Sequence, residues 1–185
     1  VELAEEGKLI KRDAARVQEA LISVLEDEDE LVSVRRRALE SIAPCGHLDI
    51  EAWIHWAHKS EDPSLRQSAV FAMGRTCDPV WLSFVVEEMV SDDPAMRFEA
   101  ANAAREFADT EALRFLHELV EDTDPEVAMA AIRAIGGIGG AMARKLLHRY
   151  SDRGEGPVSE AAAEALSTLE MDEADFSMMA VEEDR

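Results

Sequence analysis

The chain carries, at residues 62–74, the stretch DPSLRQSAVFAMG, and two related stretches follow it, DPAMRFEAANAAR at 93–105 and DPEVAMAAIRAIG at 124–136. Each begins with Asp-Pro, in which the aspartate can cap a helix and the proline suits its first turn. Each continues into alanines and larger apolar residues with the spacing of a helix packed on one face. The sequence therefore predicts helices that begin at Pro63, Pro94 and Pro125.

These starts are 31 residues apart, and the same spacing reaches outward to Val32 and Gly156. Each of the five anchors is followed by alanine after six residues and by an apolar residue after ten. The two columns are Ala38, Ala69, Ala100, Ala131, Ala162 and Ile42, Met73, Ala104, Ile135, Leu166. Small alanines on the packed side let neighbouring helices approach closely. A fixed period of this length indicates a solenoid of paired helices.

Each repeat is predicted to contain two antiparallel helices. The first helices are expected near 13–26, 48–60, 79–91, 110–121 and 140–151, and the second near 31–43, 63–75, 94–107, 125–137 and 157–169. Gly74 and Gly136-Gly137 are interpreted as helix ends. The glycine-rich stretch 136–140 is interpreted as a turn, because no strand precedes it and no Lys-Ser/Thr follows it, as a phosphate-binding loop requires.

The domain organisation follows from this period. We expect an N-terminal helical extension, or the edge of a longer protein, over 1–12, because the chain starts at Val1 inside a helical stretch. The repeat array is expected over 13–169, in units 13–43, 48–75, 79–107, 110–137 and 140–169. Residues 170–185 are predicted to form an acidic C-terminal tail or cap, since acidic runs are usually solvated ends.

The composition favours a folded, helical and acidic protein. Apolar residues make up 47% of the 185 residues and charged residues 32%, with 9 glycines and 6 prolines. This balance argues against disorder and against a turn-rich β fold. The formal net charge of −21 would repel nucleic-acid phosphates and anionic membranes. We therefore expect a protein partner, best matched by one with a basic surface, and neither a nucleic acid nor a membrane.

The two cysteines, Cys45 and Cys77, fit neither a zinc pattern nor a disulfide framework. They are interpreted as small buried thiols in a reducing compartment. The sequence contains no run of about 18 apolar residues and no signal peptide. A cytoplasmic location is therefore expected.

Three side chains of one predicted helix could converge on a metal ion, namely Glu51, His55 and His58. Trp53 and Trp56 alternate with them, and no further ligand cluster is evident. We interpret the segment as a half-exposed aromatic helix with two surface histidines. No Ser-His-Asp or Cys-His arrangement can be inferred from the scattered residues. Neither catalytic residues nor a cofactor or metal is expected.

The repeat resembles the HEAT-repeat family, and in its short bacterial form it is similar to the repeats of phycobilisome-lyase-like proteins. The resemblance is carried by the Asp-Pro motifs at 62–66, 93–97 and 124–128 and by the Ala-rich helices after them, and it covers about 13–169. It implies an all-α, right-handed α-α superhelix of about five helix pairs, whose second helices line a concave groove. The resemblance is specific for fold and not for activity.

HEAT repeats typically stack a ladder of aspartates and arginines along their second helices, and here that ladder is incomplete. The arginine positions hold Arg35, Arg66, Arg97, Ala128 and Ser159, and the acidic positions six residues before the first four hold Asp29, Ser60, Ser91 and Asp122. The last two units are therefore expected to stack less rigidly.

The predicted function is a non-enzymatic protein–protein interaction scaffold, because stacked repeats present an extended concave surface to a partner peptide or domain. The alternatives are a metal- or tetrapyrrole-dependent enzyme similar to the phycobilin lyases, and a structural spacer of a larger protein. HEAT-like deoxyhypusine hydroxylases hold two irons with several His-Glu pairs, whereas this chain has one, His117-Glu118, interpreted as solvated. HEAT-like DNA glycosylases require a basic groove, which the charge disfavours.

A candidate binding face follows from the helix geometry. In each second helix the core side is centred six to nine residues after the anchor, so the positions four and eight after it should face outward, into the implied groove. Those positions are charged at both ends of the array, as a solvated face should be. In the middle repeats they form an apolar centre with a polar rim, made of Phe71, Phe98 and Met129 and of Gln67, Asn102 and Arg133. Exposed aromatics and Met beside an Arg are typical of an interface centre.

Overall fold

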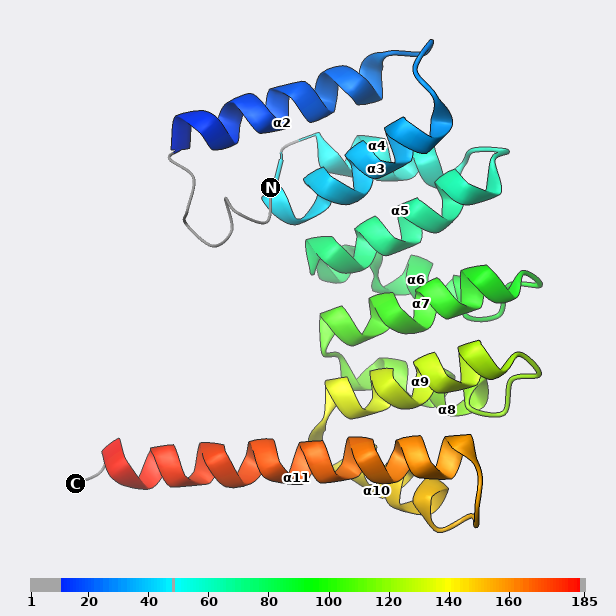
Figure 1. Cartoon of the computed structure of the whole chain (residues 1–185), viewed down its shortest axis with the longest axis vertical. Helices are drawn as coiled ribbons and strands as arrows, with labels where there is room; N and C mark the ends of the chain where they lie inside the picture. The colour runs from blue at the N-terminus through cyan, green and yellow to red at the C-terminus, as the bar shows by residue number, and fades with distance from the viewer. Residues whose placement is uncertain (1–10, 48, 184–185) are drawn as a thin grey trace. The chain divides into compact units, whose positions relative to one another are not determined.

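The computed structural model describes residues 11–47 and 49–183, and the surroundings of the side chains at 13–47 and 49–171. Over these described residues the chain forms ten α-helices and three short 3-10 helices, and no strand occurs among them (Figure 1). The all-α class predicted from the repeat period is therefore confirmed. The chain divides into an N-terminal unit, residues 1–81, and a C-terminal unit, residues 82–185.

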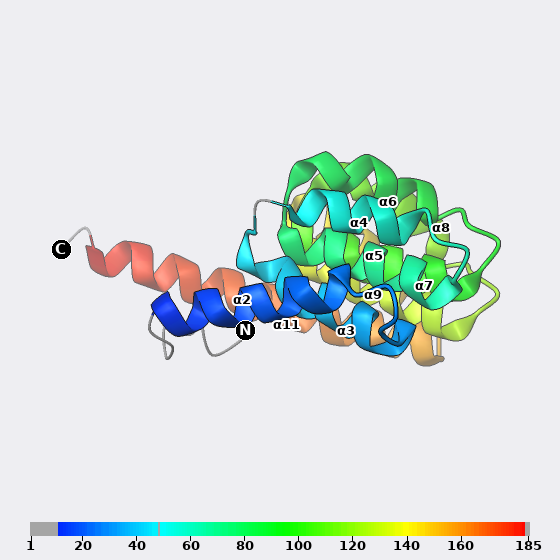
Figure 2. The same ribbon diagram turned by 90° about the horizontal axis from the view of Figure 1, so that it is seen from above.

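The N-terminal unit contains four described α-helices. They are α2 (Lys11–Glu26), α3 (Val32–Ile42), α4 (Ile50–His58) and α5 (Pro63–Thr76), with 3-10 helices η1 (Ala43–Cys45) and η2 (Pro79–Trp81). Helices α3 and α5, the second helices of their repeats, lie side by side, and α4 packs against α5. Viewed from above, α4 lies to one side of α3 and α5 (Figure 2). The two helices of each repeat thus form two layers.

The C-terminal unit repeats this arrangement. Its helices are α6 (Leu82–Glu88), α7 (Pro94–Phe107), η3 (Thr110–Ala112), α8 (Leu113–Leu119), α9 (Pro125–Ile138), α10 (Gly140–Ser151) and α11 (Pro157–Glu183). The second helices α7, α9 and α11 run side by side in that order, and α6, α8 and α10 pack against them.

The two repeat columns form the core. Ala69, Ala100, Ala131 and Ala162 are all 0% exposed, and the apolar residues four positions later in each helix are buried as well. A fully buried Ile, Leu or Met side chain contributes about 1.5–3 kcal/mol to the folded state. The prediction that alanine lets the second helices pack closely is confirmed by this complete burial.

The Asp-Pro motifs cap the second helices as predicted. The carboxylate of Asp62 accepts hydrogen bonds from the backbone N–H groups of Ser64 and Leu65, at 2.8 and 3.2 Å. Asp93 and Asp124 each accept one at 2.9 Å, from Ala95 and Glu126. Such a cap is worth about 1 kcal/mol. The hydrogen bond from the Ser64 hydroxyl and those from the backbone lower the pKa of Asp62.

Gly74 and Gly136-Gly137 stand in the last turns of their helices, as predicted, but they do not terminate them, because α5 continues to Thr76 and α9 to Ile138. Gly74 lies within α5, and Gly136 and Gly137 lie within α9. A Cβ on Gly136 would stand 3.0 Å from the Cβ of Ala165, and one on Gly137 would stand 2.5 Å from the side chain of Arg105. These glycines therefore give α7 and α11 room to approach α9. The turn comes only at Gly139 and Gly140, both of which have positive φ.

The helices α5 and α7 end instead at residues that are not glycine. Cys77 and Ala108 adopt the left-handed conformation, with φ of 52° and 51°. Cys77 is exposed and Cys45 is half-buried, so the prediction of two buried thiols is wrong. Cys77 is exposed because it follows the last turn of α5 in the loop toward η2.

Replacing Ala108 by glycine should stabilise the C-terminal unit by about 1 kcal/mol, because the left-handed conformation costs an L-residue roughly that much. Ala108 is exposed and its backbone N–H already donates to the carbonyl of Arg105 at 3.2 Å, so no packing is lost. Urea unfolding followed by circular dichroism measures the difference. The matched substitution Ala163→Gly, at an exposed site inside α11, should destabilise by about 1 kcal/mol. Equal effects of the two substitutions would contradict the assignment of strain to Ala108.

The last helix is longer than predicted. It was expected to end near residue 169, whereas α11 continues to Glu183. No glycine or proline occurs after Pro157, so the sequence contains no signal that would stop the helix. The acidic segment that follows residue 169 therefore continues α11 as far as Glu183. The composition had indicated a tail or cap for this segment.

Candidate partner-binding face

The six residues predicted to form the binding face lie on three second helices. Gln67 and Phe71 belong to α5 in the N-terminal unit, and we call them the N-terminal pair. Phe98 and Asn102 on α7 with Met129 and Arg133 on α9 belong to the C-terminal unit, and we call them the C-terminal cluster. The two residues on each helix are four apart and therefore project from the same side of it.

The N-terminal pair is accessible to solvent. Phe71 is 37% exposed, although its chain neighbours Val70 and Ala72 are both 0% exposed. Gln67, one turn earlier, is half-buried. A phenylalanine that stays partly in water beside a well-packed core is available to contact another molecule.

The C-terminal cluster joins side chains from two neighbouring helices. Phe98, Asn102 and Met129 are half-buried and Arg133 is exposed. Helices α7 and α9 lie side by side, and the two residues on each helix stand at the same repeat positions. Further burial of Phe98 and Met129 by a partner would be favourable by about 25 cal/mol for each Å² of apolar surface removed from water.

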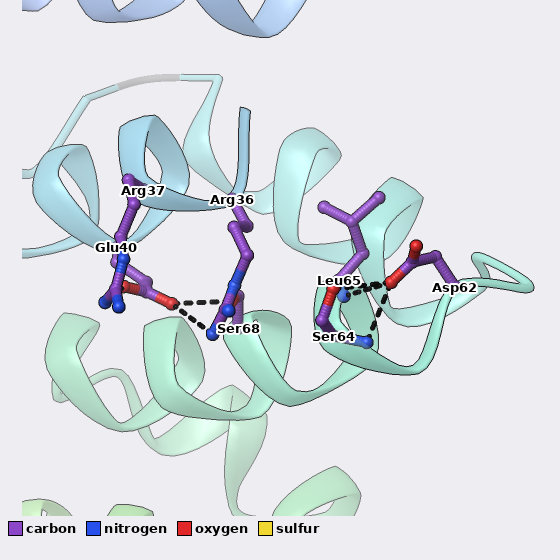
Figure 3. Close-up of polar contacts among 7 residues, drawn as sticks. All are labelled: Arg36, Arg37, Glu40, Asp62, Ser64, Leu65 and Ser68. Carbon is purple, nitrogen blue, oxygen red and sulfur yellow. Dashed lines mark hydrogen bonds and ion pairs between the residues drawn. The ribbon is translucent and has the colours of Figure 1, made fainter. Parts of the chain in front are cut away.

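One charged end of the predicted face is not solvated. In the first repeat the equivalent residues are Arg36 and Glu40, and both contact the buried hydroxyl of Ser68 on α5 (Figure 3). Arg36 Nε donates to Ser68 Oγ at 3.0 Å, and Ser68 Oγ donates to Glu40 Oε1 at 2.6 Å. Arg36 and Arg37 also form ion pairs with Glu40, at 3.3 and 2.6 Å. These contacts bind α3 to α5, so the prediction of a solvated face is wrong here.

The other charged end is solvated as predicted. Glu160 and Glu164 of α11 stand at the equivalent positions of the last repeat, and both are exposed. The face of the C-terminal unit therefore changes from apolar on α7 and α9 to acidic on α11.

The arginine ladder has one ion pair among the residues that the structure describes. Arg97 Nε and Nη2 donate to the two carboxylate oxygens of Asp122, at 2.7 and 2.8 Å, and Arg97 Nη1 donates to the carbonyl oxygen of Ser91 at 2.8 Å. The side chains of Arg97 and Asp122 are 16% and 7% exposed. The hydrogen bonds from Arg97 hold the pKa of Asp122 below its usual value. This pair links two successive repeats of the C-terminal unit.

The other ladder positions use different contacts. Arg66 donates to the carbonyl oxygens of Ser60 and Glu61, both at 2.9 Å. Arg35 donates to the carbonyl oxygen of Leu25 at 2.7 Å and lies 4.2 Å from the ring centre of Trp56. Arg66 therefore holds the loop before its own helix, whereas Arg35 contacts the last turn of α2 and an aromatic side chain of α4. In the last repeat the hydroxyl of Ser159 donates to the carbonyl oxygen of Ser151, the last residue of α10, at 2.8 Å.

The candidate metal residues do not form a site in the described part of the chain. The ring of His55 packs against Trp81 with 4.8 Å between ring centres, His58 is half-buried and Glu51 is exposed. Over residues 11–47 and 49–183 no three His, Cys, Asp or Glu side chains are grouped so that they could hold a metal ion.

His117 is half-buried and hydrogen-bonded, so the prediction of a solvated His117-Glu118 pair holds only for the glutamate. Its Nδ1 lies within hydrogen-bonding distance of the Tyr150 hydroxyl, which donates to the backbone carbonyl of His117 at 3.0 Å. Tyr150 is fully buried, and this burial raises its pKa. Glu118 is exposed. The histidine thus anchors α10 to α8, a contact that the sequence pattern did not indicate.

Among the described helices, none combines the length and the apolarity that crossing a membrane would require.

Comparison with solved structures shows the same fold in other proteins. The complex of CpcE and CpcF of phycocyanin lyase from Nostoc sp. PCC7120 is similar with a TM-score of 0.63 and 22% identity, over 82% of this chain and 64% of that one. Two engineered proteins are similar with TM-scores of 0.60 and 0.58, each at 23% identity, over 86% and 85% of this chain and 81% and 48% of theirs. The chain thus spans less than two thirds of the length of the lyase chain that it matches.

Comparison of sequences identifies the family. No curated protein is similar enough in sequence to count as a relative. The sequence pattern of HEAT repeats matches residues 50–123 and, in a second overlapping match, residues 82–167. Together these matches cover more than half of the chain, and they fall on the helix pairs whose buried alanines and Asp-Pro caps are described above. The chain belongs to the HEAT-repeat family.

Proposed function

We propose that this chain is a non-enzymatic scaffold that binds a partner peptide or domain through the N-terminal pair and the C-terminal cluster. The observation that carries the proposal is the partial exposure of Phe71, Phe98 and Met129, one on the second helix of each of three successive repeats. Side chains at these positions belong neither to the core nor to a charged surface. Each has a polar neighbour one turn away, which matches the apolar centre and polar rim of a protein interface.

Affinity capture from a cell lysate, followed by mass spectrometry, tests this proposal. A scaffold should retain a defined protein, and excess free chain should compete for it at a saturable concentration. If the only retained proteins are ones that an unrelated protein of equal charge also retains, the chain is better explained as a structural spacer.

A second candidate function is a lyase-like enzyme, and the similarity to the phycocyanin lyase complex favours it over other enzymatic activities. That similarity, at 22% identity, concerns the fold. Absorption spectra of the protein mixed with a bilin, together with metal analysis, distinguish the two functions. A red-shifted, stoichiometric bilin complex would support the enzyme, and an unchanged bilin spectrum would support the scaffold.

We expect no detectable binding of DNA or RNA at physiological salt. The formal net charge is −21, and nucleic-acid affinity depends mainly on basic side chains that neutralise phosphates. Fluorescence anisotropy with a labelled duplex and a labelled single-stranded RNA measures this. Micromolar binding that survives about 150 mM salt would contradict the assignment to a protein partner.

A further inference from the structure

Helix α11 extends the C-terminal cluster with two unpaired carboxylates. Glu160 and Glu164 occupy the same repeat positions as Met129 and Arg133, and α11 packs directly against α9. Both glutamates are exposed, and neither carboxylate forms a hydrogen bond or ion pair with another described residue. The backbone carbonyl of Glu164 accepts a hydrogen bond from the hydroxyl of Thr168 at 3.1 Å, which leaves its carboxylate free.

The face therefore combines apolar and acidic surface in a definite order. From α7 to α11 it presents Phe98, then Met129 with Arg133, then Glu160 with Glu164. Neighbouring helix axes lie about 8–10 Å apart, so the apolar and acidic parts are roughly one helix diameter from each other. A single partner segment can contact both parts at once.

The negative charge of the chain favours a basic partner segment over an acidic one. The chain has a formal net charge of −21, so an acidic segment would be repelled during approach and would leave both glutamates opposed by like charge. Arg133 is the one basic residue at these positions in α7, α9 and α11. A segment with basic side chains would gain attraction at Glu160 and Glu164 while its apolar side chains cover Phe98 and Met129.

We propose that the partner binds the C-terminal unit through a basic amphipathic segment, with apolar side chains on Phe98 and Met129 and Lys or Arg side chains at Glu160 and Glu164. This inference rests on the proposed scaffold function and specifies the partner. A helix that crosses from α7 to α11 spans about 18 Å, which corresponds to roughly 12 residues at 1.5 Å each.

The test uses fluorescein-labelled amphipathic peptides, each about 18 residues long so that they exceed this span. One carries Leu and Lys, the second carries Leu and Glu, and the third carries Ser and Lys. Fluorescence anisotropy with the whole chain should show that the Leu/Lys peptide binds at least about tenfold more tightly than either of the others, a difference of about 1.4 kcal/mol.

Charge-matched variants locate the binding. The double substitution Glu160→Gln with Glu164→Gln should weaken binding of the Leu/Lys peptide about fivefold, as expected for two partly exposed ion pairs. The control Glu111→Gln with Glu118→Gln removes the same charge from exposed positions on η3 and α8, and should change affinity less than about twofold. Equal weakening by both variants would overturn the proposal, because it would show attraction to net charge alone.

A further variant separates this inference from the scaffold function. Phe98→Ala should also weaken binding of the Leu/Lys peptide. Suppose that the Leu/Glu peptide binds more tightly than the Leu/Lys peptide, and that Phe98→Ala weakens binding of the Leu/Glu peptide. The binding face is then retained and the basic partner is rejected. If Phe98→Ala changes the affinity of neither peptide, the face itself is rejected.

Discussion

Replacing Phe71 and Phe98 together by alanine is expected to abolish capture of the partner while the protein remains folded. Phe71 is 37% exposed and Phe98 is half-buried, so their removal should cost about 1 kcal/mol of stability each, or less. At the centre of an interface, however, truncating an aromatic anchor costs about 2 kcal/mol or more, which is roughly 30-fold in affinity. Quantitative affinity capture and urea unfolding measure the two effects separately.

The matched control replaces two exposed apolar residues elsewhere. Val90 is 71% exposed and Met142 is 56% exposed, and neither belongs to the N-terminal pair or the C-terminal cluster. Val90→Ala with Met142→Ala should therefore leave capture unchanged. A stability loss of about 3–5 kcal/mol in a single Phe variant, the size seen for core phenylalanines, would show that the residue is part of the core and reject it as a binding residue.

Replacing Asp122 by alanine is expected to destabilise the C-terminal unit by about 3 kcal/mol. The carboxylate accepts two hydrogen bonds from Arg97 and one from the backbone N–H of Asp124, at 2.8 Å. Its removal leaves the largely buried guanidinium without a countercharge, which is the costly way to break such a pair. The control Asp92→Ala removes an exposed carboxylate from the loop before α7 and should cost less than about 0.5 kcal/mol.

The pH dependence of stability gives this prediction a second readout. The hydrogen bonds from Arg97 lower the pKa of Asp122 in the folded state. The stabilisation is therefore fully present above the unfolded-state pKa of about 3.9 and is lost as the pH falls through the folded-state value. The difference in stability between the wild type and Asp122→Asn should shrink over this acidic window. A difference that stays constant down to about pH 2 would show that the charge of Asp122 contributes nothing.

The repeat period predicted which side of each second helix is buried. A helix that packs on one face repeats its small and apolar residues at 3.6-residue spacing, and this spacing identifies the packed face. Ala100 and Ala131, which lie on that face, are both 0% exposed. The starts of these helices were also predictable, since an aspartate followed by proline satisfies free backbone N–H groups locally. Both features depend on residues close together in the sequence.

The candidate face was predictable only in part. Helical spacing placed Phe71 and Phe98 opposite the core, and the partial exposure of both is consistent with that placement. The same spacing placed Arg36 and Glu40 in solvent, where the structure instead shows them bound to Ser68. The difference arises because helix periodicity gives the direction of a side chain and not the distance to the next helix.

By itself, the sequence determined the helical repeat, its caps, its core columns and the acidic charge, because each depends on local spacing or on composition. Only the tertiary structure decided that Gly137 makes room for Arg105, that Arg97 pairs with Asp122, and that Tyr150 holds His117. These partners are 25 to 33 residues apart, in neighbouring repeats. Whether they meet depends on the separation and rotation of packed helices, which are set by all the side chains between them.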